Sequence, residues 1–419
     1  MCGLTAIFSY GAKAPPVDQD ELNIISDHMS VRGPDGEGLW LSGDSKVGFA
    51  HKRLAIIDTS DNGAQPMTLL DNDGQVRFVI TYNGEIYNYK SLREQLLNQG
   101  HRMNTMSDTE VLLHLYDRYG VGMVDKLRGM YAFAIWDAHH KGLFIARDPF
   151  GIKPLYYADD GTTIRIASQV KALLAGGKLG RSLEPAGHVG FFLFGYVPEP
   201  YTLYSDIRAL PSGTSLWIEE GGKQKYQTFF DARTHLGGRV PNADPVDKKA
   251  RLRDALLSSV RDHLVSDVPV GIFLSSGLDS ATVTGLASES SSVSLNTMTL
   301  QFRELSGGPM DEAPLAKKIA AIYGTRHRTR TVIGSDFYNE IDSLFSAMDQ
   351  PSIDGANTYF VAKEASGLGL KVALSGLGGD ELFGGYPSFR QIPRLVNGLG
   401  WIPGLSGLGK AFRIISSPI

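Results

Sequence analysis

The chain has 419 residues, of which 21% are charged, and a net charge of -4. This length exceeds what one hydrophobic core usually supports, so we expect two domains, and the charge offers no basic field for a phosphate backbone, which argues against a nucleic-acid partner. The single cysteine, Cys2, excludes an intrachain disulfide, and the lack of a signal-peptide pattern or a long apolar span predicts a cytoplasmic location away from membranes.

The first half is predicted to consist of short strands with few helices, which suggests a layered α+β architecture. The strands expected from apolar runs are Leu4 to Phe8, Val47 to Phe49, Leu54 to Ile57, Val76 to Tyr82, Tyr131 to Trp136, Gly142 to Ala146 and Ile164 to Ala167. The helices expected from apolar periodicity are Asp20 to Met29, Tyr89 to Asn98 and Thr109 to Tyr119.

The second half, from Val246, alternates helices with strands, which predicts a parallel α/β sheet. Its expected strands are Val270 to Leu274, Leu295 to Phe302, His327 to Val332 and Lys371 to Leu374. Its expected helices are Asp247 to Val265, Ser280 to Ala287, Glu312 to Tyr323, Asp336 to Met348 and Thr358 to Ser366. Residues 214–245 are expected to form the boundary between domains at 2–213 and 246–419, because the stretch Glu219 to Asp244 contains Gly221, Gly222, Gly237, Gly238 and Pro241.

Cys2 becomes the first residue if Met1 is removed, which would place a thiol and an α-amino group on one residue. An α-amino group titrates near pH ~7.7–8.0 and can take the thiol proton without a histidine. A lone cysteine is more often a small buried hydrophobic residue, so position alone does not decide between these interpretations.

Eight ordered motifs favour catalysis. They are MCGLTAIF, RGPDGEG, HKRLAIID, GAQPM, YNGEIYN, SDTE, RGMYAFAIWD and RDPFGIKPLYY. In this order they resemble the class II glutamine amidotransferases, whose fold is that of the N-terminal-nucleophile glutaminases. The resemblance implies that Cys2 attacks the side-chain amide of glutamine and releases ammonia from a thioester.

The resemblance also implies roles for other residues of these motifs. Arg53 would bind the glutamine α-carboxylate, which suits a planar guanidinium. The Asn83 side chain and the Gly84 N–H would form the oxyanion hole, and Glu85 and Asp108 would face the α-ammonium group. Without the motifs, Arg53 would be interpreted as a surface arginine, Asn83-Gly84 as a hairpin turn, and Glu85 and Asp108 as solvated acids. Val31 stands where the family commonly has histidine, which puts local loop packing in question.

Two loops of the second half follow predicted strands and combine small residues with an aspartate. Ser275, Ser276, Gly277, Asp279 and Ser280 lie in the first loop, and Ser375, Gly376 and Asp380 lie in the second. A strand, loop and helix arrangement aims backbone N–H groups at an anion, and ligands bind at the carboxyl ends of such strands. Two carboxylates, Asp279 and Asp380, would serve Mg²⁺ on a nucleotide polyphosphate.

These loops resemble the pyrophosphate loop of ATP pyrophosphatases and, taken with the first half, the asparagine synthetase family. The resemblance implies contacts of ATP with Leu274, Leu300, Ser375 and Gly376, although both leucines also suit any buried strand. It implies that ATP activates an acceptor carboxylate as an acyl adenylate, which ammonia then attacks. The expected partners are glutamine, ATP with Mg²⁺, and aspartate, with room for a homodimer.

Leu377 departs from the family pattern, because glutamate is familiar at this position and leucine takes no part in proton transfer. The family-like sequence also fades after Phe389. The acceptor therefore stays open between aspartate and another carboxylate, such as a sugar acid or a cell-envelope precursor. A glutaminase with a degenerate synthetase half and a non-catalytic scaffold are further alternatives, the scaffold disfavoured by the intact site residues. Residues Asp349 to Asn357 are expected near the acceptor.

Overall fold

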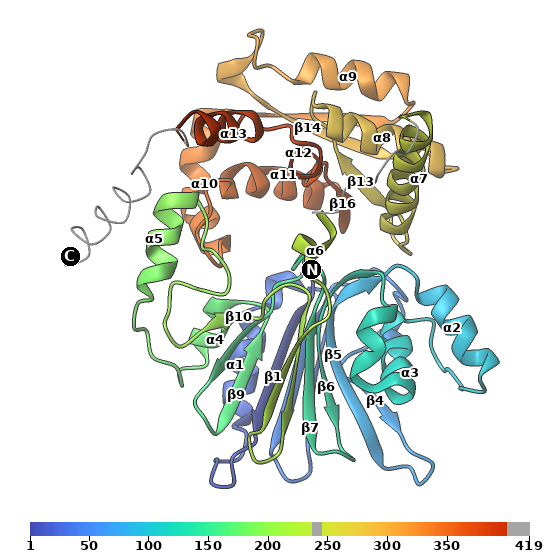
Figure 1. The fold of residues 1–419 in the computed structure, drawn as a ribbon, viewed down its shortest axis with the longest axis vertical. Coiled ribbons are helices and arrows are strands. Elements are labelled where there is room, and N and C mark those ends of the chain that lie inside the picture. The colour runs from blue at the N-terminus through green and yellow to red at the C-terminus, as the bar shows by residue number, and fades with distance from the viewer. Residues whose placement is uncertain (237–244, 400–419) are drawn as a thin grey trace.

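The computed structural model describes residues 1–236 and 245–399. Its first half contains two antiparallel sheets, each covered by helices on its outer face (Figure 1). The first sheet has the strand order β10-β8-β9-β1-β3-β2. Its strands are β1 (Gly3–Ser9), β2 (Gly36–Leu41), β3 (Val47–Arg53), β8 (Tyr156–Asp159), β9 (Thr163–Ala167) and β10 (Arg208–Ala209).

The second sheet has the strand order β12-β11-β7-β6-β5-β4. Its strands are β4 (Met67–Leu70), β5 (Val76–Ile86), β6 (Gly129–Asp137), β7 (Gly142–Arg147), β11 (Thr214–Glu219) and β12 (Gln224–Thr228). The helices of this half are α1 (Gln19–Asp27), α2 (Tyr89–Asn98), α3 (Asp108–Tyr119), α4 (Val170–Ala175), α5 (Pro185–Phe194) and α6 (Ala232–Leu236). Short 3-10 helices lie at Ser30–Arg32, Asp61–Gly63 and Gly120–Lys126.

Strand alternation explains the layers. On β5, Val79 faces β1 and joins Phe8 and Phe49 in the core between the sheets, whereas its neighbours Phe78 and Ile80 face α3. A third core lies between the first sheet and the helices α1 and α4. The result is a helix, sheet, sheet, helix sandwich, and it confirms the layered α+β prediction for this half.

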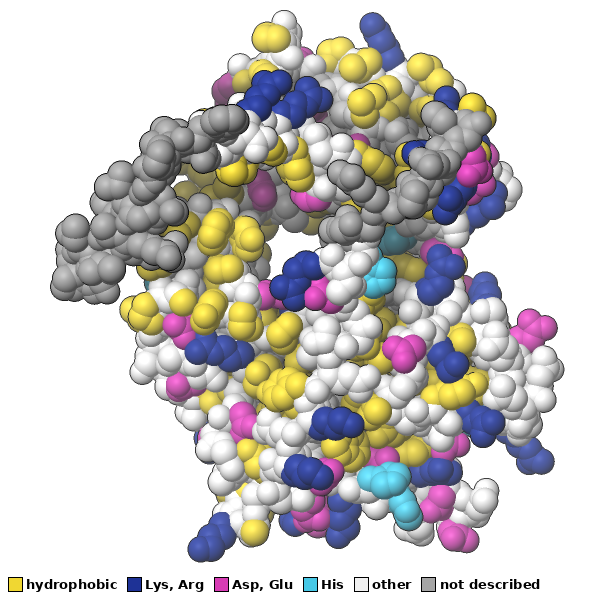
Figure 2. Space-filling view, in the orientation of Figure 1, with side chains coloured by type: hydrophobic (Ala, Val, Ile, Leu, Met, Phe, Trp, Pro, Cys, Tyr) yellow, Lys and Arg dark blue, Asp and Glu magenta, His cyan; other side chains and the backbone are white. Residues whose placement is uncertain are grey.

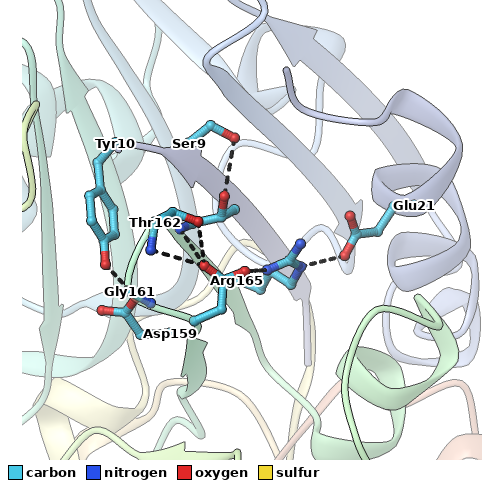
Figure 3. Close-up of polar contacts among 9 residues, drawn as sticks. Ser9, Tyr10, Glu21, Asp159, Gly161, Thr162 and Arg165 are labelled. Carbon is cyan, nitrogen blue, oxygen red and sulfur yellow. Dashed lines mark hydrogen bonds and ion pairs between the residues drawn. The ribbon is translucent and has the colours of Figure 1, made fainter. Parts of the chain in front are cut away.

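A buried ion pair ties α1 to the first sheet (Figure 3). Nε of Arg165 on β9 donates to Glu21 over 2.6 Å, and Nη1 donates to Asp160 over 2.9 Å. The Tyr10 hydroxyl donates to Asp159 over 2.5 Å in the same region. Since the side chains of Arg165 and Glu21 are 9% and 3% exposed, the loss of either would leave a buried charge without its partner.

The second half has a parallel four-stranded sheet of order β15-β14-β13-β16, which confirms the predicted α/β class. Its strands are β13 (Val270–Phe273), β14 (Asn296–Phe302), β15 (Arg326–Val332) and β16 (Val372–Leu374). Its helices are α7 (Pro245–His263), α8 (Leu278–Ser290), α9 (Ala313–Ile322), α10 (Gly334–Ala347), α11 (Gly355–Gly367), α12 (Gly379–Phe383) and α13 (Ser388–Leu399), with a 3-10 turn at Arg303–Leu305.

Two regions differ from the sequence prediction. Leu54 to Ile57, predicted as a strand, is a loop, because its backbone groups pair with Asp35 and with residues of the second half rather than with a neighbouring strand. The expected boundary 214–245 begins with the β11–β12 hairpin, which pairs with β7 in the second sheet. Residues 237–244 of that boundary, and residues 400–419 of the predicted second domain, lie outside the described residues.

The two halves face each other across an opening (Figure 2), with exposed hydrophobic side chains of α5 at one side of it. Phe192 and Leu193 on this helix are 84% and 70% exposed. Within residues 1–236 and 245–399, no helix is long and apolar enough to cross a membrane.

Candidate active sites

A pocket at the amino terminus brings together three residues that the sequence predicted to act on glutamine: Cys2, Arg53 and Asp108. Cys2 lies just before β1, Arg53 ends β3, and Asp108 begins α3. Gly84, on β5, also lines the pocket. The remaining lining residues are Leu54, Ile56, Ile57, Gly63, Gln65, Tyr82, Ser107 and Thr109.

The Cys2 thiol lies against the backbone of Leu54. Its Sγ accepts a hydrogen bond from the Leu54 N–H at 3.3 Å and lies 3.6 Å from the Leu54 carbonyl oxygen. Burial raises the pKa of the thiol. Burial also lowers the pKa of the Met1 amino group beside it to about 5, so this amino group is neutral near pH 7.

Arg53 is held in position by backbone carbonyls. Its guanidinium donates to the carbonyl oxygens of Ser60, over 2.7 Å, and of Asp58. No carboxylate is paired with it in the described residues, since both contacts are to backbone oxygens. The guanidinium is thus oriented at the pocket wall and keeps a charge with which to bind an anion.

The strand β5 divides its predicted residues between two faces. Gly84 lies with Tyr82 at the pocket, whereas Asn83 and Glu85 alternate with them and share the face of Val79, which is turned toward the first sheet. Asn83 is 1% exposed and its Nδ2 has no hydrogen-bond partner. A buried amide donor without a partner is costly, so it marks a place where an acceptor oxygen would be stabilised.

Both predicted acids are buried and hold their protons more tightly than usual. Burial raises the pKa of Asp108 to about 6, and its carboxylate accepts from the Tyr82 hydroxyl at 2.9 Å and from the Ile86 N–H at 3.0 Å. Burial raises the pKa of Glu85 to about 7, and its Oε2 has no partner. The structure brings Asp108 to the pocket with Cys2 and Arg53, whereas Glu85 is not among the residues that line it. The charge of Glu85 nevertheless interacts with Lys153 and with the amino terminus.

Three residues near the nucleophile lay in the recognised motifs but were given no role from the sequence. Gln65 of GAQPM accepts from the Tyr82 N–H at 2.7 Å. Arg32 of RGPDGEG donates from Nε to the Cys2 carbonyl over 3.0 Å. Lys153 of RDPFGIKPLYY is buried, and its charge interacts with Glu85 and Cys2. Their positions within the recognised motifs were the signal by which the sequence could have identified all three as site residues. Val31 is 90% exposed, so this departure from the family pattern does not disturb packing.

The first predicted ATP loop is closed by serine hydroxyls. The Ser280 hydroxyl lies 2.8 Å from the Ser275 hydroxyl and accepts from the Ser275 N–H at 3.1 Å. The Gly277 N–H donates to Ser275 Oγ over 3.2 Å, and α8 begins directly after Gly277. Ser276 lies in the turn between β13 and α8, and Asp279 lies in the first turn of α8, at the positive end of the helix dipole.

The second loop packs directly on the first, as the sequence predicted. A Cβ built on Gly379 would lie 2.3 Å from Oδ2 of Asp279, and one built on Gly376 would lie 2.8 Å from the Ser280 backbone nitrogen. Only glycine permits this approach, because any side chain at either position would overlap the first loop. Ser375 and Asp380 belong to this second loop and to the start of α12.

A Mg²⁺ ion that serves a nucleotide is compatible with these loops. The described residues hold no cluster of three or more His, Cys, Asp or Glu side chains that could bind a metal alone. Mg²⁺ at nucleotide sites is usually held by one or two carboxylates together with phosphate oxygens. Asp279 and Asp380, on the two touching loops, fit that requirement.

The three leucines of interest differ in environment. The Leu274 side chain is buried against Ala316 and Ala320, and its N–H donates to the Met298 carbonyl. Leu300 lies on β14 and is partly exposed. Leu377 is 84% exposed in the second loop. The Leu274 side chain is thus part of a core, and its predicted contact with ATP stays a prediction.

The segment predicted to lie near the acceptor makes contacts between the two halves. The Asp349 carboxylate accepts from the N–H groups of Val170 and Lys171, each at 2.9 Å, and so caps α4 from the other half of the chain. Gln350 accepts from the Leu203 N–H at 3.1 Å. These contacts of Asp349 and Gln350 dock the second half onto the first. They account for both side chains without a contact to the acceptor substrate.

Comparison with known proteins identifies both halves. Residues 1–230 match the family model described as a glutamine amidotransferase domain, and residues 251–416 match the one described as asparagine synthase. Asparagine synthetase [glutamine-hydrolyzing] 1 of Bacillus subtilis is 39% identical over 98% of this chain and 62% of its own length. A protein of Methanocaldococcus jannaschii, provisionally named as an asparagine synthetase [glutamine-hydrolyzing], is 32% identical over 96% of this chain and 80% of its own.

A third relative carries a different name. Amidase chry2 of Gibberella zeae is 31% identical over 93% of this chain and 60% of its own length. The chain spans about 60% of the length of this protein and of the first Bacillus subtilis relative. From the two family matches and the near full-length similarity, the chain belongs to the glutamine-hydrolysing asparagine synthetase family.

Proposed function

We propose that the chain hydrolyses glutamine at Cys2 and transfers the ammonia to a carboxylate activated by ATP. The observation that carries the proposal is the pocket in which Cys2, Arg53 and Asp108 meet. A nucleophile, a guanidinium for a carboxylate and a carboxylate for an ammonium group match the two ends of glutamine. The two ATP-type loops that touch at Asp279 and Gly379 support the second half of the proposal.

In the first step, the Cys2 thiolate attacks the side-chain carbonyl of glutamine. The α-amino group that Cys2 gains when Met1 is removed accepts the thiol proton and passes it to the departing ammonia. The unpaired Nδ2 of Asn83 and the Gly84 N–H stabilise the oxyanion. Water then hydrolyses the thioester to glutamate. Arg53 and Asp108 hold the α-carboxylate and the α-ammonium group, and Glu85 acts on the ammonium group through its charge.

In the second step, the acceptor carboxylate attacks the α-phosphorus of ATP, pyrophosphate leaves, and ammonia displaces AMP from the acyl adenylate. Ser275, Ser276, Gly277, Ser280, Ser375 and Gly376 line the proposed phosphate site, with Leu274 and Leu300 toward the nucleotide. Asp279 and Asp380 would hold Mg²⁺, which when bound neutralises polyphosphate charge. The residues of the chain orient the phosphates with backbone N–H groups and the Ser275 and Ser280 hydroxyls.

Aspartate is the proposed acceptor, because relatives of this chain are named asparagine synthetases. A different carboxylate is the second candidate. It is favoured by Leu377, an exposed side chain that cannot transfer protons in the second loop, and by the relative named as an amidase. A sugar acid or a cell-envelope precursor would belong to this candidate class.

The test follows glutamate and pyrophosphate in one reaction that contains glutamine, ATP and Mg²⁺, with and without aspartate. Aspartate-dependent pyrophosphate, together with asparagine, supports the synthetase with aspartate as acceptor. Glutamate without aspartate-dependent pyrophosphate rules out aspartate as the acceptor and leaves two alternatives, another carboxylate or a glutaminase with a degenerate synthetase half. If neither product forms, the proposed function is contradicted.

A further inference from the structure

The loop Leu54–Asp58 forms much of the wall of the glutamine pocket, yet it belongs to no sheet. Leu54, Ile56 and Ile57 line the pocket, and the loop follows directly after Arg53. A loop of this kind has backbone N–H and C=O groups that need partners from elsewhere. Several of these partners come from the second half of the chain.

Asp267 holds the far end of the loop. Its backbone N–H donates to the Ile56 carbonyl oxygen over 3.0 Å, and its carboxylate accepts from the Asp58 N–H at 2.8 Å. The carbonyl oxygen of Asp58 in turn accepts from the Arg53 guanidinium. One residue of the second half therefore fixes the backbone on which Arg53 rests.

Lys371 holds the near end. Its Nζ donates to Oδ2 of Asp35 over 2.7 Å and lies 3.4 Å from the Ala55 carbonyl oxygen. The same Asp35 oxygen accepts from the Ala55 N–H at 2.8 Å, and the adjacent Leu54 N–H donates to Cys2 Sγ. Burial raises the pKa of Asp35, but the Lys371 hydrogen bond and charge prevail and hold it below its usual value. The carboxylate thus stays ionised between the two halves.

Both residues stand at the starts of the strands that lead to the ATP-type loops. Asp267 comes shortly before β13, and Lys371 comes directly before β16. These strands are parallel neighbours in the sheet. Their amino ends therefore hold the glutamine loop, and their carboxyl ends carry the Ser275 and Ser375 loops. Short strands in a hydrogen-bonded sheet are stiff, so the two sites share one rigid support.

We propose that Asp267 and Lys371 are positioning residues for the glutamine pocket: they hold the loop Leu54–Asp58 so that Arg53 and Cys2 keep the geometry that glutamine requires. The inference rests on the proposed glutaminase activity. It assigns the second half an indirect part in glutamine binding, in addition to its part in ATP chemistry. Neither residue touches glutamine, so both act through the loop.

The expected signature is a change in affinity. Asp267→Ala removes the acceptor of the Asp58 N–H and loosens the support of Arg53. Lys371→Met keeps the length of the side chain but removes its charge. Each variant of the full chain is expected to raise the KM for glutamine about fivefold to twentyfold, a range typical of coupling between sites. The kcat of glutaminase should stay within about twofold, because the reacting atoms are untouched.

Conservative variants and a matched control separate positioning from general damage. Lys371→Arg and Asp267→Asn retain a donor or an acceptor and should restore most of the affinity. Lys363→Met is the control, because Lys363 also forms an ion pair of the second half, with Glu340, but does so within that half. It should leave both KM and kcat unchanged. Thermal unfolding curves of all variants report any loss of folding.

A measurement of active-site occupancy at Cys2 completes the test. Cys2 is the only cysteine, so the rate of its alkylation by iodoacetamide, read by mass spectrometry, reports glutamine occupancy through protection. The glutamine concentration that gives half protection should rise in Asp267→Ala and Lys371→Met. Unchanged half-protection and KM in variants that fold like wild type would overturn the proposal, whereas a wild-type chain that releases no glutamate would contradict the proposed glutaminase itself.

Discussion

Gly63 and Arg53 are in direct contact at the wall of the pocket that contains Cys2. A Cβ added to Gly63 would lie 2.2 Å from Nη2 of Arg53 and 2.8 Å from the Asp58 carbonyl oxygen that this nitrogen contacts. The glycine therefore makes the space in which the guanidinium lies. Its motif, GAQPM, was recognised in the sequence, but the need for glycine at this position is visible only in three dimensions.

Gly63→Ala is expected to displace the Arg53 guanidinium and to raise the KM for glutamine about tenfold to a hundredfold, because a misplacement of about 1 Å has effects of this size. Steady-state glutaminase kinetics measure the change. Gly43→Ala is the control, since a Cβ at Gly43 meets nothing within 4 Å. An unchanged KM in Gly63→Ala would mean that Arg53 does not bind the substrate.

From the raised pKa of Glu85 we predict that the unfolding free energy of the chain depends on pH. Its pKa is raised from 4.5 to about 7 by burial, so the stability it contributes is complete below about pH 4.5 and is lost as the pH rises toward 7. Glu85→Gln is neutral throughout. From pH 5 to pH 8 the wild type should therefore lose about 2 to 3 kcal/mol of unfolding free energy relative to this variant.

Urea unfolding of both proteins at pH 5 and pH 8 measures that difference. Glu94→Gln, at an exposed glutamate of α2, is the control and should follow the wild type. If the stabilities of Glu85→Gln and wild type change in parallel with pH, Glu85 ionises normally and is not buried as the structure shows.

The contacts of Asp349 lead to a prediction about the stability of the docked halves. Its carboxylate supplies the cap that Gln169, the residue before α4, does not supply. Asp349→Ala should destabilise the docked chain by about 1 to 2 kcal/mol, the usual effect of losing a helix cap. Denaturant unfolding gives the value. Asp354→Ala, which removes an exposed aspartate of the same segment, should have little effect; equal losses in both variants would exclude a specific role for Asp349.

From the position of Gly379 we predict that a substitution there changes the geometry of the two ATP-type loops and leaves glutaminase activity unchanged. A Cβ at this position would lie 2.3 Å from Asp279 Oδ2, so Gly379→Ala should move that carboxylate and lower ammonia-dependent pyrophosphate release at least tenfold. Glutamate formation should persist. Gly367→Ala, where a Cβ meets nothing within 4 Å, is the control. Wild-type pyrophosphate release in Gly379→Ala would show that Asp279 does not serve the nucleotide.

The features of the fold that depend on local sequence pattern were predicted correctly. Both fold classes followed from apolar runs and from the alternation of helices with strands, and the approach of the two ATP-type loops followed from the parallel sheet. The prediction failed at Leu54–Ile57, where an apolar run forms a loop. Periodicity could not show that Asp35, Asp267 and Lys371 would pair with its backbone, because Asp267 and Lys371 are distant in the chain.

A similar limit applies to the candidate sites. The motifs named Cys2, Arg53 and Asp108, and the fold brings them to one pocket. The placement of Glu85 outside the pocket lining depends on the register of β5 within its sheet, which the motif did not contain. The docking role of Asp349 depends on how the two halves meet.

The most direct test of the account is the Cys2→Ala variant, assayed for glutamate and pyrophosphate with either glutamine or ammonium chloride as the nitrogen source, in the presence of ATP, Mg²⁺ and aspartate. The account predicts that glutamate formation and glutamine-dependent pyrophosphate release are lost, while ammonium-dependent pyrophosphate release continues. Glutamate formation at the wild-type rate by Cys2→Ala would contradict the account, because it would show that glutamine is hydrolysed elsewhere.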